Sequence, residues 1–245
     1  MLAIIGGSGL TSLANLEITH RQVIRTPYGE PSGPLTFGRI RSQEIIFIAR
    51  HGYGHTIPPH EVNYRANLWA LHSQGVKEVV AVNSVGGIHA TLAPGVIALP
   101  NQILDYTYGR KHTFFEGADH PVTHIDFTHP YCEKLRERCI VAAKRANVAM
   151  QPTGVYAAVQ GPRLETKAEI DRLERDGATM VGMTGMPEAA LARELEICYA
   201  AITVVANHAA GRGDSSQAIE LAAIYKVLEA GMAEARHILE ALVTE

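Results

Sequence analysis

The sequence predicts one α/β domain spanning residues 1–245, with a mixed, largely parallel sheet flanked by helices. Short apolar runs alternate with segments of helical spacing through much of the chain, as expected when helices connect parallel strands. Several of the apolar runs end in glycine or polar residues, as strands do where an α/β sheet binds ligands. No linker, internal repeat or low-complexity tract divides the chain.

Eight segments are predicted as strands because they are short, apolar or β-branched, and bounded by turn residues. The first stops at Gly6 and Gly7, and the second and third are expected to pair with each other. The fifth follows a turn at Pro94 and Gly95. In chain order the strands are Leu2–Ile5, Leu35–Ile40, Glu44–Ala49, Glu78–Val82, Val96–Leu99, Gly154–Val159, Met180–Met183 and Tyr199–Ala206.

Five segments are predicted as helices because their apolar residues recur at helical spacing. The first ends at Gly75, and the fourth has Pro187 in its first turn, where proline is well tolerated. Residues 105–130 are rich in His, Tyr and Phe and predict a long loop, and loops of this length are usually functional. The helices are Val62–Gln74, Tyr131–Ala146, Lys167–Asp176, Pro187–Leu195 and a last helix from Ser215 to about Leu242.

Composition excludes several classes of protein. With 47% hydrophobic and 19% charged residues the chain is not disordered, and its net charge of −3 argues against a general nucleic-acid binder. No apolar run approaches the roughly 18 residues of a membrane-spanning helix, and the start lacks the basic region of a signal peptide. Cys132, Cys139 and Cys198 form no CxxC pair and cannot all pair internally, which favours reduced thiols in the cytoplasm.

Small and polar residues at the strand ends suit an anion. The loop around Ser8 offers backbone N–H groups and a hydroxyl, although a tight turn would need the same glycines. Arg50 and His51 directly follow an apolar strand, where arginine can bind an oxyanion with two hydrogen bonds, or form a surface salt bridge instead. Asn83–Gly87 and Met183–Gly185 end two further strands. An anion site assembled from these ends is the simplest hypothesis.

Other chemistries fit the sequence poorly. His51, His55 and His60 are not part of an HExxH pattern, so a catalytic metal is not expected. Ser8 lacks the Gly-x-Ser-x-Gly elbow of a serine hydrolase, and no cysteine has an evident activating neighbour. A covalent mechanism is therefore disfavoured. Taken singly, a glutamate such as Glu165 after Gly-Pro is more often a helix-start residue than a ligand, and Asn207 at a strand end is equally ambiguous.

Taken together, five segments in chain order make the sequence similar to one family. The sequence resembles the trimeric purine nucleoside phosphorylases and methylthioadenosine phosphorylases from residue 2 to about residue 230. Each segment alone is unspecific, whereas five in order are highly specific. The segments are Ile5–Leu10, Ala49–Gly52, Val62–Asn67, Gln160–Thr166 and Met183–Glu188.

The resemblance implies phosphorolysis, in which phosphate attacks C1′ of a purine nucleoside and releases the base. It implies that phosphate, the co-substrate, binds at Ser8, Arg50, His51, the Ser84 backbone and Thr184. It further implies that Met183 packs on the ribose and that no metal or organic cofactor is needed. A homotrimer, or a dimer of trimers, is implied as well, with His124 on the loop that closes a neighbour's sugar pocket.

Two positions separate the branches of this family by the purine they bind. The adenine-specific branch has Ser at the position of Glu165 and Asp at the positions of Asn207 and Ala209, whereas the 6-oxopurine branch has Glu and Asn at the first two. This chain follows the second pattern. Glu165 can accept a hydrogen bond from N1–H of a 6-oxopurine, and Asn207 can donate to N7 or O6. Such buried hydrogen bonds discriminate strongly between bases.

The sugar pocket resembles the methylthio branch. Where the inosine and guanosine enzymes have a histidine for the 5′-hydroxyl, this chain has Ile224, and Val227 and Leu228 follow at helical spacing. These three side chains are expected to form an apolar 5′ pocket, unless they only pack on the core. The expected substrate is then 5′-methylthioinosine, with inosine or guanosine and methylthioadenosine as alternatives. A metal-dependent nucleoside hydrolase and a non-catalytic purine or phosphate sensor are rival functions.

The sequence also departs from the family pattern. Gly185 and Met186 replace bulkier or β-branched residues, Val96 replaces an Asp, and Leu164 replaces an aromatic residue that packs on the purine. None of these departures removes a predicted phosphate ligand.

Overall fold

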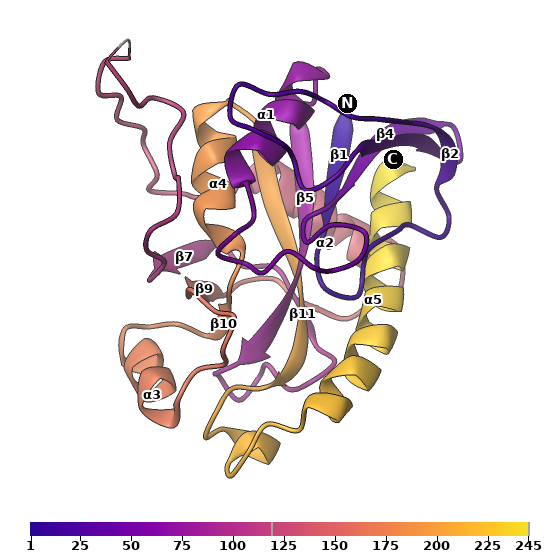
Figure 1. Ribbon diagram of the computed structural model, residues 1–245. Helices are drawn as coiled ribbons and strands as arrows, with labels where there is room; N and C mark the ends of the chain where they lie inside the picture. The colour runs from indigo at the N-terminus through magenta and orange to yellow at the C-terminus, as the bar shows by residue number, and fades with distance from the viewer. Residues whose placement is uncertain (119, 245) are drawn as a thin grey trace.

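The structure is a computed structural model that describes residues 1–118 and 120–244. Within this part of the chain a twisted sheet of eleven strands runs through the centre (Figure 1), and its main path follows the order β2-β3-β4-β1-β5-β10-β9-β7. Strand β11 pairs with β5 and β6, and β6 also pairs with β8. The strands are β1 (Leu2–Gly6), β2 (Glu17–Gln22), β3 (Leu35–Ile40), β4 (Gln43–Ala49), β5 (Glu78–Gly87), β6 (Ile97–Ala98), β7 (Gln102–Asp105), β8 (Met150–Gln151), β9 (Val155–Ala158), β10 (Met180–Gly182) and β11 (Cys198–His208).

The centre of the sheet is parallel. β1 lies parallel between β4 and β5, and β11 runs parallel to β5 over most of its length. Antiparallel pairs such as β2–β3 and β5–β10 make the sheet mixed. The α/β fold predicted from the sequence is therefore confirmed. Because parallel neighbours run in the same direction, their carboxyl ends meet at one edge of the sheet.

Helices cover both faces of this sheet (Figure 1). Along β1, Ala3 and Ile5 pack into the core beneath α1 and α4, whereas Leu2 and Ile4 pack into the core beneath α2 and α5. This alternation follows from the two-residue period of a strand, and burial on both faces explains why the central strands are continuously apolar. The helices are α1 (Tyr64–Ser73), α2 (Glu133–Arg145), α3 (Lys167–Arg175), α4 (Gly185–Glu194) and α5 (Leu221–Val243).

Several boundaries differ from the sequence prediction. β5 continues through Gly87, because residues 83–87 pair with β11 and β10 instead of forming a loop. The last helix begins at Leu221, since Gly213–Ser215 form a separate 3₁₀ turn. Met186 is non-helical, so the regular part of α4 begins at Pro187, as predicted. Three strands, β2, β7 and β8, were not predicted at all, because they are short or exposed and lack a strong apolar pattern.

The expectation that all three cysteines are reduced is wrong for one pair. Cys132, which precedes α2, and Cys198, which begins β11, form a disulfide with their Cα atoms 5.2 Å apart. The two residues are 66 positions apart in sequence, so their spacing gave no indication of the pair. The fold brings them together, because the backbone N–H of Cys132 donates to the carbonyl of Tyr199 beside Cys198.

Among the described residues no helix is both long and apolar enough to cross a membrane.

Candidate active site

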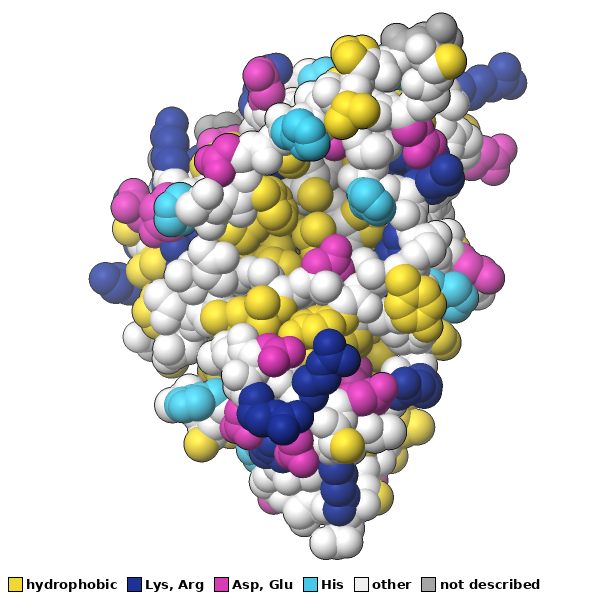
Figure 2. All heavy atoms as spheres, turned by 90° about the vertical axis from the view of Figure 1, so that its left-hand side faces the viewer, with side chains coloured by type: hydrophobic (Ala, Val, Ile, Leu, Met, Phe, Trp, Pro, Cys, Tyr) yellow, Lys and Arg dark blue, Asp and Glu magenta, His cyan; other side chains and the backbone are white. Residues whose placement is uncertain are grey.

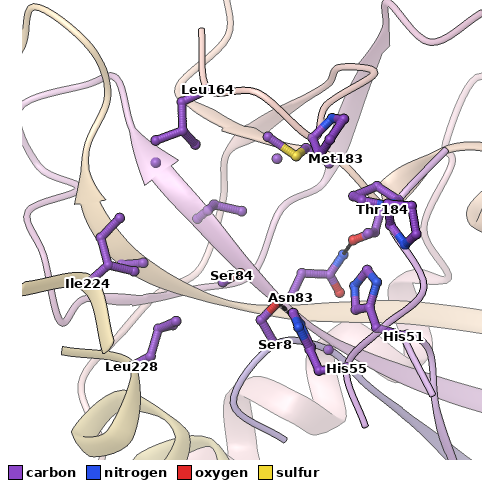
Figure 3. A pocket seen from close by; sticks show the side chains of 18 of the residues that line it. Ser8, His51, His55, Asn83, Ser84, Leu164, Met183, Thr184, Ile224 and Leu228 are labelled. Atoms are coloured by element: carbon purple, nitrogen blue, oxygen red, sulfur yellow. Dashed lines mark hydrogen bonds between the residues drawn. The ribbon is translucent and has the colours of Figure 1, made fainter. Parts of the chain in front are cut away.

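A cavity of about 430 Å³ lies at the carboxyl-end edge of the central strands. Its wall is built by the residues after β1, β4 and β10, by the ends of β5 and β11, by the 162–165 segment and by the start of α5. Ten of the twelve predicted site residues line it, and Val227 and His124 do not. Figure 3 shows Ser8, His51, Asn83 and Thr184 gathered at one end, with Leu164, Ile224 and Leu228 around the other.

Arg50 is the charged centre of the polar end. It follows β4, and its guanidinium is fully buried against Glu188 of α4, to which Nε and Nη2 donate at 2.7 and 2.8 Å. Nη1 donates to the carbonyl of Val82 at 3.2 Å. Burial alone would lower the pKa of Arg50, but the ion pair with Glu188 raises it above its ordinary value, so the cation is permanent.

The buried pair leaves Arg50 able to bind an anion. Guanidinium has five N–H donors, and the four hydrogen bonds with Glu188, Val82 and Asn83 leave one for a ligand in the cavity. Gly7 allows the close approach of the β1 loop, since a Cβ there would lie 2.9 Å from Nη1 of Arg50 and 2.4 Å from the Val82 carbonyl. The polar end is therefore rigid before any ligand arrives.

His51 lines the cavity as a neutral imidazole. Its Nδ1 lies 2.8 Å from the carbonyl oxygen of Ile57, which can only accept, so Nδ1 carries the proton and donates. Burial, together with the nearby Arg50 cation, lowers the pKa of His51 to about 4. At neutral pH Nε2 therefore offers a lone pair. That lone pair can accept the remaining proton of a hydrogen phosphate dianion.

Ser8 and His55 meet at the mouth of the polar end. The Ser8 hydroxyl lies 2.8 Å from Nε2 of His55, and the rings of His51 and His55 are 5.0 Å apart (Figure 3). The sequence suggested His55 only as a metal ligand that lacked partners. Among the described residues, no group of three or more His, Cys, Asp or Glu is arranged to hold a metal ion.

Glu165 and Asn207 also line the cavity. Glu165 is largely removed from solvent, and this burial raises the pKa of its carboxyl group. Asn207 lies just after a shift of register between β11 and β5, and the neighbouring residues Ala206 and Asn207 both line the cavity. Such a bulge turns a side chain that regular alternation would direct away, and bulges are common beside active sites.

The first two turns of α5 form the apolar wall. Leu221, Ile224, Tyr225 and Leu228 line the cavity and recur at positions i, i+3, i+4 and i+7 of one helical stripe. Val227 is partly buried but is not part of the lining. Of the predicted face of Ile224, Val227 and Leu228, the structure therefore places the first and last in the lining, with Tyr225 beside them instead of Val227. The role of Val227 in binding the 5′ group stays a prediction.

His124 is exposed on the long segment between β7 and α2 and does not reach the cavity of its own chain. In Figure 1 this segment extends away from the body of the molecule. Its predicted place in a neighbour's sugar pocket stays a prediction. Phe114 of the same segment is buried in the core, so only part of the segment is free of the body.

Sequence reasoning missed three polar residues of the site. Glu188 lies in the Met183–Glu188 segment that was recognised, but the sequence analysis gave this residue no role of its own. Asn83 is the first residue of the Asn83–Gly87 strand end, and its side chain is buried between Arg50 and Thr184. His55 was considered for the wrong chemistry. For Glu188 and Asn83, the only signal in the sequence was their position in the Met183–Glu188 and Asn83–Gly87 segments.

The arrangement agrees with the comparison to known proteins. The family model of the phosphorylase superfamily matches residues 1–244. The chain belongs to this superfamily.

Individual relatives make the similarity more specific. The chain is 52% identical over 237 residues to a probable S-methyl-5′-thioinosine phosphorylase of Pseudomonas syringae pv. tomato, with 97% of this chain and 96% of the relative covered. It is 44% identical over 215 residues to a 6-oxopurine nucleoside phosphorylase of Pyrococcus furiosus, with 86% and 80% covered. The methylthioadenosine phosphorylase of Schistosoma mansoni in complex with adenine superposes with a TM-score of 0.94 at 30% identity, covering 99% of this chain and 90% of that one.

Proposed function

We propose that this protein catalyses the phosphorolysis of 5′-methylthioinosine to hypoxanthine and 5-methylthioribose 1-phosphate. One observation carries the proposal: a buried polar end around Arg50, the two residues Glu165 and Asn207, and an apolar helix wall line the same cavity. These three parts match the phosphate, the 6-oxopurine and the 5′-methylthio group. Relatives named S-methyl-5′-thioinosine phosphorylase and 6-oxopurine nucleoside phosphorylase support it.

Phosphate is proposed to bind at Ser8, Arg50, His51, Thr184 and the backbone of Ser84. Cleavage of a glycosidic bond passes through a state with positive charge on the sugar and negative charge on the leaving base. The phosphate dianion stabilises the first charge and supplies the nucleophilic oxygen. No covalent enzyme intermediate, metal or organic cofactor enters this scheme. Met183, which lines the cavity, is proposed to pack on the ribose.

The base is proposed to bind Glu165 and Asn207. The ionised Glu165 accepts from N1–H of hypoxanthine, whereas adenine would present a lone pair at N1 and be repelled. Asn207 donates to N7 or O6 and its hydrogen bond strengthens as negative charge develops on the base, so it acts mainly in the transition state. A mismatch at such a buried site costs about 1–3 kcal/mol.

The decisive experiment is to follow base release from 5′-methylthioinosine, methylthioadenosine and inosine, each with and without phosphate. Release that depends on phosphate and is fastest with 5′-methylthioinosine is expected. Preference for inosine would overturn the proposed 5′ pocket, and preference for methylthioadenosine would overturn the proposed role of Glu165. Release without phosphate would indicate a hydrolase, and no release from any nucleoside would indicate a binding protein.

We further propose that residues 1–245 form one phosphorylase domain that assembles as a homotrimer, or a dimer of trimers, in the cytoplasm. Figure 2 shows an apolar surface, hollowed at its centre, on the side where α3 and the 105–130 segment lie, and such a surface suits a neighbouring subunit. The neighbour's His124 would then close the sugar pocket. Light scattering of the purified protein measures the assembly, and a monomer with full activity would contradict it.

A further inference from the structure

We propose that Asn83 is a positioning residue that fixes the direction of the Thr184 hydroxyl, so that this hydroxyl can only donate to the bound phosphate. The inference rests on the proposed function, since it concerns how the phosphate end of the cavity is organised. It assigns a role to a side chain that is 1% exposed and that contacts two of the proposed phosphate ligands.

Arg50 determines which way the Asn83 amide points. Nη2 of Arg50 donates to Oδ1 of Asn83 at 3.4 Å, and a guanidinium has no acceptor atom, so the amide oxygen must face it. Arg50 cannot turn away, because both oxygens of Glu188 hold its Nε and Nη2. Tyr199 secures the carboxylate in turn by donating to Oε1 at 2.8 Å.

The amide in turn determines the role of Thr184. With Oδ1 facing Arg50, Nδ2 faces the Thr184 hydroxyl and donates to Oγ1 at 2.9 Å (Figure 3). An amide nitrogen only donates, so Oγ1 accepts here, and its own proton must point elsewhere. Within residues 1–118 and 120–244 no protein acceptor receives that proton. Thr184 lines the cavity, so the proton is left for a ligand there.

This chain of hydrogen bonds prepares the site for an acceptor-rich anion. A free hydroxyl can rotate and present either its proton or its lone pairs, whereas the Thr184 hydroxyl is held as a donor before phosphate binds. Donors oriented in advance need no reorganisation when charge arrives. In the series Glu188–Arg50–Asn83–Thr184, each hydrogen bond fixes the donor and acceptor atoms of the next, so the buried carboxylate determines that Thr184 presents a donor to the cavity.

The test is a double-mutant cycle on the phosphate KM, with Asn83→Leu and Thr184→Val. Leucine is similar in size to asparagine but neither donates nor accepts. Thr184→Val is expected to raise the phosphate KM about tenfold and Asn83→Leu about threefold to tenfold, with small effects on the nucleoside KM. In the Thr184→Val background, Asn83→Leu should have almost no further effect on the phosphate KM. In a Thr184→Ser background, which keeps the hydroxyl, Asn83→Leu should again raise the phosphate KM by its full factor.

Asn67→Leu is the matched control. Asn67 is also fully buried and uses both ends of its amide, accepting from the backbone N–H of Ser32 and donating to the Ser32 hydroxyl. Its replacement should lower thermal stability without changing the phosphate KM. If Asn83→Leu does not fold, Asn83→Ala replaces it in the cycle.

An equal effect of Asn83→Leu on the phosphate KM with and without the Thr184 hydroxyl would overturn the inference. Calorimetric titration of inorganic phosphate repeats the cycle as Kd values and needs no turnover. A wild-type protein that binds phosphate but releases no base would overturn the proposed function, while the binding cycle would still decide the role of Asn83. Wild-type protein that does not bind phosphate would overturn both.

Discussion

At the polar end of the cavity Arg50 and Glu188 are both 0% exposed, whereas at the apolar end Leu221 and Tyr225 of α5 are 60% and 75% exposed. The first end is held by side chains that bond to one another and come from the residue after β4, from β5, and from α4 and its N-cap. The second is one face of the first two turns of a helix whose N-cap residue, Glu220, makes no capping side-chain hydrogen bond.

The difference follows from what each end is proposed to recognise. Phosphate is small and charged and is the same co-substrate whichever nucleoside is cleaved, and binding it demands donors in fixed positions. The 5′ group differs between nucleosides and is recognised by apolar contact, which is roughly proportional to buried area and tolerates movement. Substitutions at the phosphate end should therefore have large and sharp effects, and those at the α5 end small and graded ones.

The largest effect is expected from Glu188→Ala. It leaves the fully buried Arg50 cation without its partner, which typically costs about 3–5 kcal/mol of unfolding free energy. Chemical denaturation measures this loss. Glu44→Ala is the control, because it removes the partner of Arg39 in a pair whose side chains are 53% and 62% exposed, where about 1 kcal/mol or less is expected. Similar losses of unfolding free energy in the two variants would show that the buried Arg50–Glu188 pair contributes no more to stability than the exposed Arg39–Glu44 pair.

The polar end was also the part of the cavity whose lining the sequence predicted best. Ser8, Arg50 and His51 each follow a strand of the parallel centre of the sheet, so the parallel arrangement was enough to bring them to one edge. Thr184 follows β10, which runs antiparallel to β5 and reaches the same cavity from the opposite direction. Glu188 could not be predicted as their partner. The chain positions of Arg50 and Glu188 are far apart, and only the packing of α4 against the sheet shows that the carboxylate reaches the guanidinium.

The α5 end was predicted less well for a physical reason. Helical spacing predicts that a stripe of apolar residues exists, but the rotation of the helix about its axis depends on what it packs against. Residues that differ by one position are about 100° apart on a helix, so Val227 and Leu228 can share a stripe only at its two edges, and a modest rotation of the helix removes one of them. Leu228 is buried toward the core and cavity, which turns Val227 away from the cavity lining. Cys132 and Cys198 were missed for a similar reason, because their contact depends on how α2 meets β11.

An intermediate effect is expected from Glu165→Gln, which removes the acceptor for N1–H but keeps the size of the side chain. The KM for 5′-methylthioinosine should rise about tenfold to a hundredfold, with the phosphate KM nearly unchanged. Glu169→Gln is the control. Glu169 lies on α3, where it caps the helix and pairs with Arg163, and glutamine can keep the capping interaction. Equal effects of the two variants on substrate KM would contradict the proposed base contact.

The same residue predicts a pH dependence. Burial raises the pKa of Glu165, so as the pH falls the carboxyl group takes up a proton at a higher pH than an exposed glutamate would. As the pH is lowered, the nucleoside KM should therefore begin to rise at a pH above the range in which exposed carboxylates titrate. This rise of KM at acid pH should disappear in Glu165→Gln. Stability changes in the opposite direction. A raised folded-state pKa contributes stability at low pH that is lost as the pH rises through it, so Glu165→Gln should be slightly more stable at neutral pH.

The smallest effect, and the sharpest test of the α5 end, comes from comparing Ile224→Ala with Val227→Ala. Both replace a β-branched aliphatic residue in the same helix, but only Ile224 lines the cavity. Ile224→Ala should raise the KM for 5′-methylthioinosine about threefold to tenfold through lost apolar contact and leave the KM for inosine nearly unchanged. Val227→Ala should alter neither. If Val227→Ala weakens 5′-methylthioinosine as much as Ile224→Ala does, α5 binds the substrate with the face predicted from the sequence, and the start of this helix must rotate when the nucleoside enters.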